Sequence, residues 1–180
     1  MAITVLRLGH RPMRDKRVTT HLFLAARALG AEGGIYSGVR DRSLEETLAS
    51  VCRGWGGTFK VEYTEDWRKT IKQWNGKVVH LTMYGMPFRE AIPAIRSEAV
   101  DKLVVVGGEK VPREAYHLAD WNISVTSQPH SEVSALSLFL HEYFEGRELE
   151  KEFEGAQLRV VPQERGKKVI RTCASHFEKI

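Results

Sequence analysis

With 180 residues, 42% of them hydrophobic, the chain is long enough for one well-buried core and short for two domains. Its two cysteines, Cys52 and Cys173, stand far apart without a Cys/His cluster, so neither a zinc site nor a disulfide framework is indicated. No run approaches the roughly 18 apolar residues of a membrane span, and the first residues lack the apolar block of a signal peptide. We therefore expect a soluble, cytoplasmic protein that uses no metal and no membrane.

The amino-terminal half alternates between strand and helix patterns. Residues 3–8 are typical of a strand and residues 9–17 of a long basic loop, after which Thr19 or Thr20 can cap a helix that stops at Gly30. Further strands are expected at residues 35–36 and 58–63, and helices at residues 44–51 and 65–74. The tryptophans of the last helix, at core spacing, favour packing over base stacking.

The alternation continues through the second half. Strands are expected at residues 77–82, 103–106 and 121–125, with a loop over residues 83–87, a helix around residues 88–95 limited by Pro93, and helices at residues 113–119 and 131–144. Six strands that alternate with helices predict an α/β fold in which a mostly parallel sheet carries helices on both faces.

The carboxyl-terminal tail differs from the rest. Residues 158–161 and 167–171 flank a turn and predict an appended hairpin, which divides the chain into a domain over residues 1–154 and an extension over residues 155–180. The formal net charge of +4 is unevenly distributed. Basic side chains gather in residues 7–17 and again in the tail, so two separated segments could meet on a polyanion. A solvated surface explains the charge equally well.

Three of the expected strands end in small or polar residues. These ends are Leu81–Thr82, Val106–Lys110 and Ser124–Ser131. Loops at the carboxyl ends of neighbouring parallel strands form the usual ligand crevice of open α/β folds. Gly107 and Gly108 permit close backbone approach, and Glu109 adds a hydrogen-bond acceptor. A tight turn required by geometry is the simpler reading of the two glycines. Neither a G-x-G-x-x-G nor a P-loop motif is present, which disfavours a dinucleotide or P-loop site.

The last of these strand ends runs into an amphipathic helix. Its apolar residues recur at helical spacing, and Ser127 or Ser131 could cap its first turn beside Pro129. Such a turn presents unpaired backbone N–H groups and small hydroxyls at the edge of a sheet. An ordinary helix start fits about as well as a binding site. The apolar positions cover more than one stripe, which predicts that this helix contributes to a homodimer interface.

The segments Val104–Lys110 and Ser124–Ser134 resemble the second and third motifs of the SPOUT methyltransferases. The basic segment Gly9–His21, with Ala26–Ala31, is similar more narrowly to the archaeal tRNA cytidine 2′-O-methyltransferases that act in the TψC loop. The resemblance covers essentially the whole chain. It implies a homodimer, a deep trefoil knot in the carboxyl-terminal half, and S-adenosylmethionine as cofactor. Where many ribose methyltransferases of the superfamily carry an asparagine, this chain has His130-Ser131-Glu132.

The resemblance also assigns a set of residues to the cofactor. These are Leu81, Val106, Gly107, Gly108, Glu109, Lys110, Ser124, Val125, Thr126, Ser127, Gln128, Pro129, His130 and Ser131.

Ribose methylation needs an in-line approach to the methyl group, a way to handle the hydroxyl proton, and cations that hold the flanking phosphates. Arginine stays protonated and is a poor base, so Arg17 is expected to position a phosphate and stabilise the developing alkoxide, with Arg14 as a further catalytic candidate. Ser131 is a candidate to orient the hydroxyl. His21 and His130 ordinarily titrate near neutrality, although a lone histidine is more often structural.

We therefore expect an S-adenosylmethionine-dependent tRNA ribose 2′-O-methyltransferase that modifies a cytidine in the TψC loop. One alternative is a methyltransferase of the same fold that acts on a ribose or base of ribosomal RNA. Another is a non-catalytic RNA-binding α/β module, in which the basic segment is an electrostatic footprint. Binding of the cofactor distinguishes a methyltransferase from a non-catalytic module. Mapping of the methylated nucleotide distinguishes the tRNA methyltransferase from one that acts on ribosomal RNA.

Overall fold

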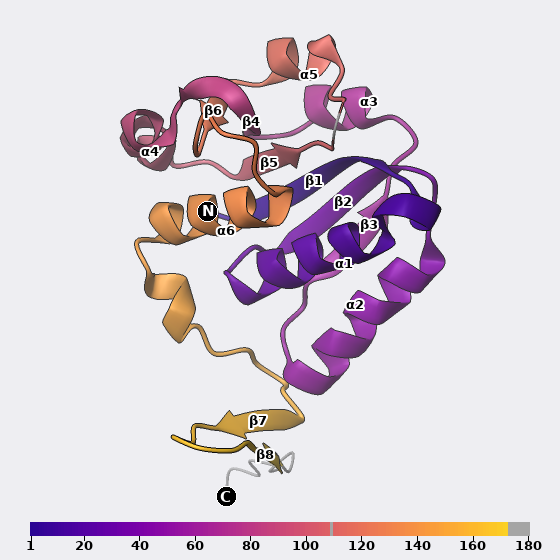
Figure 1. Cartoon of the computed structure of the whole chain (residues 1–180), viewed down its shortest axis with the longest axis vertical. Coiled ribbons are helices and arrows are strands. Elements are labelled where there is room, and N and C mark those ends of the chain that lie inside the picture. Colours follow the sequence, from indigo (N-terminus) through magenta and orange to yellow (C-terminus); the bar gives the residue numbers. More distant parts are fainter. Residues whose placement is uncertain (109, 173–180) are drawn as a thin grey trace, which may run out of the picture.

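The computed structural model describes residues 1–108 and 110–172, without the side chain of Lys16. Its centre is a six-stranded sheet in the order β3-β2-β1-β5-β4-β6, and every neighbouring pair is parallel (Figure 1). The strands are β1 (Ile3–His10), β2 (Gly33–Gly38), β3 (Lys60–Tyr63), β4 (Lys77–Pro87), β5 (Lys102–Val106) and β6 (Trp121–Ser124). The predicted α/β fold with a parallel sheet is confirmed.

Helices cover both faces of this sheet. On one face, α1 (Pro12–Ala28), α2 (Arg42–Trp55), α4 (Phe88–Ser97) and α6 (Glu132–Phe144) share a core with strand residues such as Val5 and Val104. On the other face, α3 (Trp67–Lys72) and α5 (Arg113–Leu118) pack on residues such as Leu6 and Val105. Side chains that alternate along a strand point to opposite faces, so these strands, buried on both sides, are nearly continuous apolar runs.

The basic segment after β1 is helical rather than a loop. Helix α1 begins at Pro12, whereas the sequence reading placed its start at Thr19 or Thr20, so the expected loop is wrong from residue 12 onward. Proline fixes a helical φ and needs no N–H partner at the first position of a helix. The Arg11 Nε donates to the Asp15 Oδ2 over 2.8 Å, which further ties down the first turn. The arginines therefore stand on a rigid helix start.

Strand β4 also differs from expectation, because it continues through residues 83–87, which were expected to form a loop. Its pairing with β6 shifts between Leu81 and Met86, both of which lie opposite Ile123. Such a bulge adds residues to one strand only. A Cβ at Gly85 would lie 2.4 Å from the Asn122 backbone, so glycine is needed for this close approach. Helix α4 continues past the exposed Pro93 to Ser97.

The predicted carboxyl-terminal hairpin is present. Strands β7 (Leu158–Val161) and β8 (Lys168–Arg171) pair antiparallel after the short helix η1 (Arg147–Glu150), at one end of the molecule (Figure 1). Two backbone hydrogen bonds tie the segment before β7 to the end of α2, from the Gln157 N–H to the Gly54 carbonyl and from the Gly57 N–H to the Glu154 carbonyl. None of the helices in the described residues is long and apolar enough to cross a membrane.

Candidate active site

The carboxyl ends of β1, β5, β4 and β6 lie next to one another, and a cavity of about 460 Å³, here called the strand-end cleft, opens at the ends of the last three. Apolar side chains from Leu81, Val106 and Val111 form part of its wall, and Tyr116 and Glu132 add polar groups. The volume falls within the roughly 300–1,000 Å³ of small-molecule pockets. Size and lining both fit a nucleoside-like cofactor with an apolar face.

Part of the predicted cofactor set lines this cleft. The residues that do so are Leu81, Val106, Gly107, Gly108, Pro129 and His130. Lys110 lines the neighbouring cavity instead, and Glu109 lies outside the described residues. The remaining predicted residues do not line the cleft; they are Ser124 at the end of β6 and, between β6 and α6, Val125, Thr126, Ser127, Gln128 and Ser131. The structure thus brings six of the predicted residues to one cleft, and the assignment of the whole set to the cofactor stays a prediction.

The two glycines after β5 both lie close to other side chains of the chain, Gly107 far more closely than Gly108. A Cβ at Gly107 would lie 2.0 Å from the Val111 Cγ2, a distance that a branched side chain cannot relieve cheaply. A Cβ at Gly108 would lie 3.2 Å from the Arg7 Nη2. Packing against Val111 therefore accounts for Gly107, and both glycines also line the cleft.

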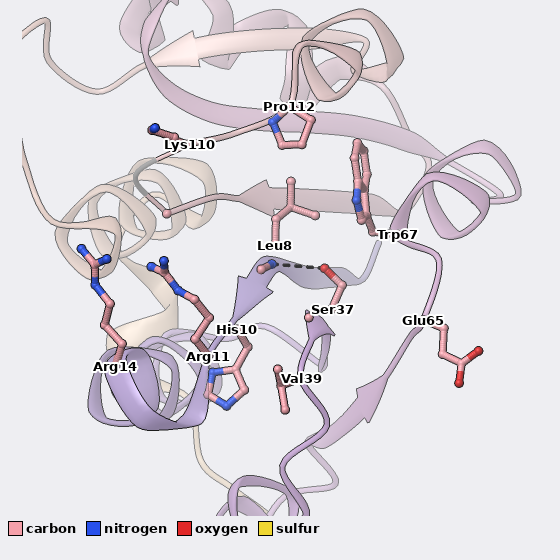
Figure 2. A pocket seen from close by; sticks show the side chains of 13 residues that line it. Leu8, His10, Arg11, Arg14, Ser37, Val39, Glu65, Trp67, Lys110 and Pro112 are labelled. Carbon is pink, nitrogen blue, oxygen red and sulfur yellow. Dashed lines mark hydrogen bonds between the residues drawn. The ribbon is translucent and has the colours of Figure 1, made fainter.

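A second cavity of about 630 Å³, here called the basic cavity, lies beside the cleft and shares Gly108 with it. Arg11 and Arg14 from the start of α1 and Lys110 from the β5–α5 loop stand on one side, and Trp67 lies across from them (Figure 2). Three cations around one cavity favour a polyanion such as RNA. Figure 2 shows that Glu65 lies on the far side of the cavity from the arginines.

The candidate catalytic residues occupy different positions. Arg14 lines the basic cavity, whereas Arg17 is exposed and lines neither cavity. Ser131 is exposed and caps α6, because its Oγ accepts a hydrogen bond from the Val133 N–H over 3.2 Å. His21 is exposed, and the His130 Nδ1 lies 2.7 Å from the Gln128 carbonyl oxygen at the mouth of the cleft. The structure brings Arg14 and His130 to the cavities but not Arg17.

Two buried polar side chains were missed by the sequence reading. Arg7 on β1 is only 2% exposed, and its Nη2 lies 3.5 Å from the Glu132 Oε1. Burial lowers the pKa of Arg7, and the nearby Glu132 carboxylate opposes that shift. The alternation of β1 places Arg7 on the same face as Ile3 and Val5, which was the available signal. The partner of Arg7 is distant in sequence and could not be inferred.

The second buried polar side chain is that of His80 on β4, which is fully buried. Its Nδ1 lies 2.8 Å from the Asn122 Oδ1, and its ring meets the Tyr116 ring edge-on at 4.6 Å. Burial lowers the pKa of His80, because the charged form would lose its hydration. This histidine supports the Tyr116 wall of the cleft from behind.

Solved structures that share this fold are RNA-modifying enzymes. The A. aeolicus TrmH/SpoU tRNA modifying enzyme aligns with a TM-score of 0.60 at 16% identity, covering 82% of this chain and 76% of that one. The AdoMet-bound rRNA methyltransferase from Sinorhizobium meliloti aligns with a TM-score of 0.60 at 18% identity, covering 80% of this chain and 56% of that one. The fold is that of the SpoU/TrmH methyltransferases.

Sequence similarity identifies the family to which the chain belongs among the methyltransferases with this fold. The family model described as tRNA ribose 2′-O-methyltransferase, aTrm56, matches residues 55–170. A tRNA (cytidine(56)-2′-O)-methyltransferase of Thermococcus kodakarensis is 51% identical over 173 residues, which cover 93% of this chain and 96% of the relative. One of the same name from Methanocaldococcus jannaschii is 50% identical over 175 residues, covering 95% and 97%. The chain belongs to the aTrm56 family of tRNA ribose 2′-O-methyltransferases, which confirms the resemblance noted in the sequence.

Proposed function

We propose that the protein transfers a methyl group from S-adenosylmethionine to the ribose 2′-hydroxyl of a cytidine in the TψC loop of tRNA. The observation that carries this proposal is a pair of adjoining cavities that share Gly108, one at the ends of the core strands and one lined by three cations. Family membership supports the reaction, and the names of the relatives support tRNA and cytidine.

The strand-end cleft is the proposed cofactor site. Leu81 and Val106 offer an apolar wall, and the open backbone of Gly107 and Gly108 allows close approach of a ligand. Pro129 and His130, from the segment between β6 and α6, line the site on the β6 side. S-adenosylmethionine supplies an electrophilic methyl group on a sulfonium cation. The chain itself binds and orients the reactants and excludes water.

The basic cavity is the proposed tRNA site. Arg11, Arg14 and Lys110 would hold phosphates next to the target ribose. We further propose that Arg17 stabilises the developing alkoxide and that Ser131 orients the hydroxyl. Because Arg17 lines neither cavity of its own chain, this role requires the RNA or a second copy of the chain to bring the reacting groups to it.

A homodimer is part of the proposal, as are the trefoil knot, a cytoplasmic location and the division at residues 154 and 155. On α6, Leu136, Phe139 and Leu140 are buried against the protein's own core and so are not available to a dimer interface. Leu138 is 49% exposed on α6, and Met13 and Val18 are exposed on the neighbouring α1. These side chains would be covered by a second copy. A monomer in sedimentation experiments at micromolar concentration would contradict the proposed homodimer.

The decisive test combines binding with mapping. Purified protein should bind S-adenosylmethionine in calorimetry and should methylate a tRNA transcript at one ribose, located by resistance of the adjacent phosphodiester to alkaline cleavage. A 2′-deoxycytidine at the mapped position should abolish the reaction. Methylation of ribosomal RNA alone would favour the same-fold alternative. RNA binding without any cofactor heat would instead identify a non-catalytic module.

A further inference from the structure

A partly buried ion pair joins Arg7 on β1 to Glu132 at the start of α6. The Arg7 Nη1 donates to the Leu8 carbonyl over 2.9 Å, and the Nη2 faces the Glu132 Oε1 at 3.5 Å. The Arg7 Nε is buried without a hydrogen-bond partner among the described residues. A buried arginine with one long ionic contact and an unpaired N–H is costly, which points to a function other than stability.

The location of the pair is specific. Gly108 lines both the strand-end cleft and the basic cavity, and the Arg7 guanidinium lies directly behind it, 3.2 Å from the position that a Cβ would take. Glu132 itself lines the cleft, and its side chain is 29% exposed. A methyl group held in the cleft and a ribose held in the basic cavity must meet at this shared wall. The Glu132 carboxylate therefore stands next to the only boundary that the two described cavities share.

Other carboxylates near these cavities are occupied or turned away. Asp15 accepts two hydrogen bonds from Arg11, at 2.8 and 3.3 Å. Asp41 caps α2 by accepting from the Ser43 and Leu44 N–H groups. Glu65 lies on the far side of the basic cavity (Figure 2). Glu132 makes only the 3.5 Å contact with Arg7 among the described residues and so keeps lone pairs for a substrate proton.

We propose that Glu132 is the general base of the methyl transfer and that Arg7 is its positioning residue. The inference rests on the proposed function. As the ribose oxygen bonds to the methyl carbon, its O–H bond breaks and the proton passes to Glu132. The carbon–sulfur bond breaks with its electron pair left on sulfur, which gives a neutral thioether. Arg7 holds the Glu132 carboxylate at the edge of the cleft, where it can accept this proton.

The first test is single-turnover methylation with saturating tRNA and cofactor. Glu132→Gln should lower the rate by about 10²-fold to 10⁴-fold, the usual contribution of a general base. Glu142→Gln, on the same helix but away from both cavities, should leave the rate unchanged. Added formate should partly restore Glu132→Ala. A Glu132→Gln rate within threefold of wild type would overturn the inference.

The second test reads the position of Glu132 without turnover. An anionic carboxylate at the reacting centre favours a cationic ligand, so the ratio of S-adenosylmethionine to S-adenosylhomocysteine affinity in calorimetry should fall about fivefold in Glu132→Gln, or roughly 1 kcal/mol. The wild-type ratio should persist in Glu142→Gln. An unchanged ratio in Glu132→Gln would place the carboxylate away from the methyl group and overturn the inference.

Arg7 is tested through the pH dependence of the rate. Loss of the cation in Arg7→Met should shift the acid limb of the single-turnover profile to higher pH, whereas Glu132→Gln should remove that limb. If Arg7 had only a structural role, Arg7→Met would lower the melting temperature without shifting the acid limb of the pH profile. If wild-type protein fails to methylate any tRNA, the proposed function fails; if it is active and Glu132→Gln matches it, only this inference fails.

Discussion

The two adjoining cavities are built in different ways. The strand-end cleft lies at the ends of the core strands, and its lining residues Leu81 and Val106 belong to the main buried cluster. The basic cavity carries three long cationic side chains, two of them at the start of α1. Changes in the cleft should therefore alter stability and cofactor binding together. Changes in the basic cavity should alter RNA affinity alone, because solvated charges contribute little to folding.

The largest effect is expected at Arg17. Its replacement tests whether the residues that line the two cavities are sufficient for catalysis. Arg17→Ala should lower the single-turnover rate about 10²-fold to 10³-fold at saturating tRNA, because a lost charged contact to a developing oxyanion costs that much. Lys60→Ala, which removes an exposed cation on β3, serves as control. A near wild-type rate would show that Arg17 is misassigned, and Arg14 or Arg11 would be tested next.

A smaller effect is expected from Gly107→Ala, which alters the cleft wall. The new methyl group would displace Val111, with a loss of about 1–3 kcal/mol in the free energy of unfolding and a cofactor affinity lower by about tenfold. Gly54→Ala, at a helical position where the nearest atom would lie at 3.8 Å, should change neither quantity unfavourably. Chemical denaturation and calorimetry measure the two values. A lower cofactor affinity with an unchanged free energy of unfolding would contradict the expected coupling between cofactor binding and stability.

Arg14→Ala tests the basic cavity, whose changes should alter RNA affinity alone. Its tRNA affinity should fall severalfold, and the slope of log affinity against log salt should flatten by about one unit, because one phosphate contact is lost. Cofactor affinity and unfolding free energy should stay unchanged. Filter binding across a salt series measures the slope, and an unaltered slope would exclude Arg14 from phosphate contact.

The smallest effect concerns His80 behind the cleft. Its pKa is lowered from 6.5 by burial, so the unfolded chain binds a proton that the folded chain does not. The stability contribution is complete above about pH 6.5 and falls with decreasing pH, by up to about 1.4 kcal/mol per pH unit, until the folded pKa is reached. His80→Asn should flatten the dependence of unfolding free energy on pH below 6.5, whereas the exposed His130→Gln should not.

The sequence predicted the parallel sheet, because apolar runs and turn residues are local signals. It indicated for a related reason that Leu81, Val106 and the two following glycines would lie together, since the carboxyl ends of parallel strands lie at one edge; their contact with the cofactor stays a prediction. The start of α1 was misplaced because a basic composition was read as a loop, although Pro12 marked the helix. The pairing of Arg7 with Glu132 was beyond reach, because the two residues are 125 positions apart and meet only through the order of the strands.

The attachment of the hairpin has a consequence for substrate size. Helix α2 begins near the carboxyl edge of the sheet, and its far end carries the hairpin with the exposed Lys168 and Arg171 (Figure 1). Its 14 residues span about 20 Å at the usual rise of an α-helix. Within one chain, the hairpin and the basic cavity are therefore separated by the length of α2. An RNA that contacts both basic surfaces of one chain must therefore extend over at least about 20 Å.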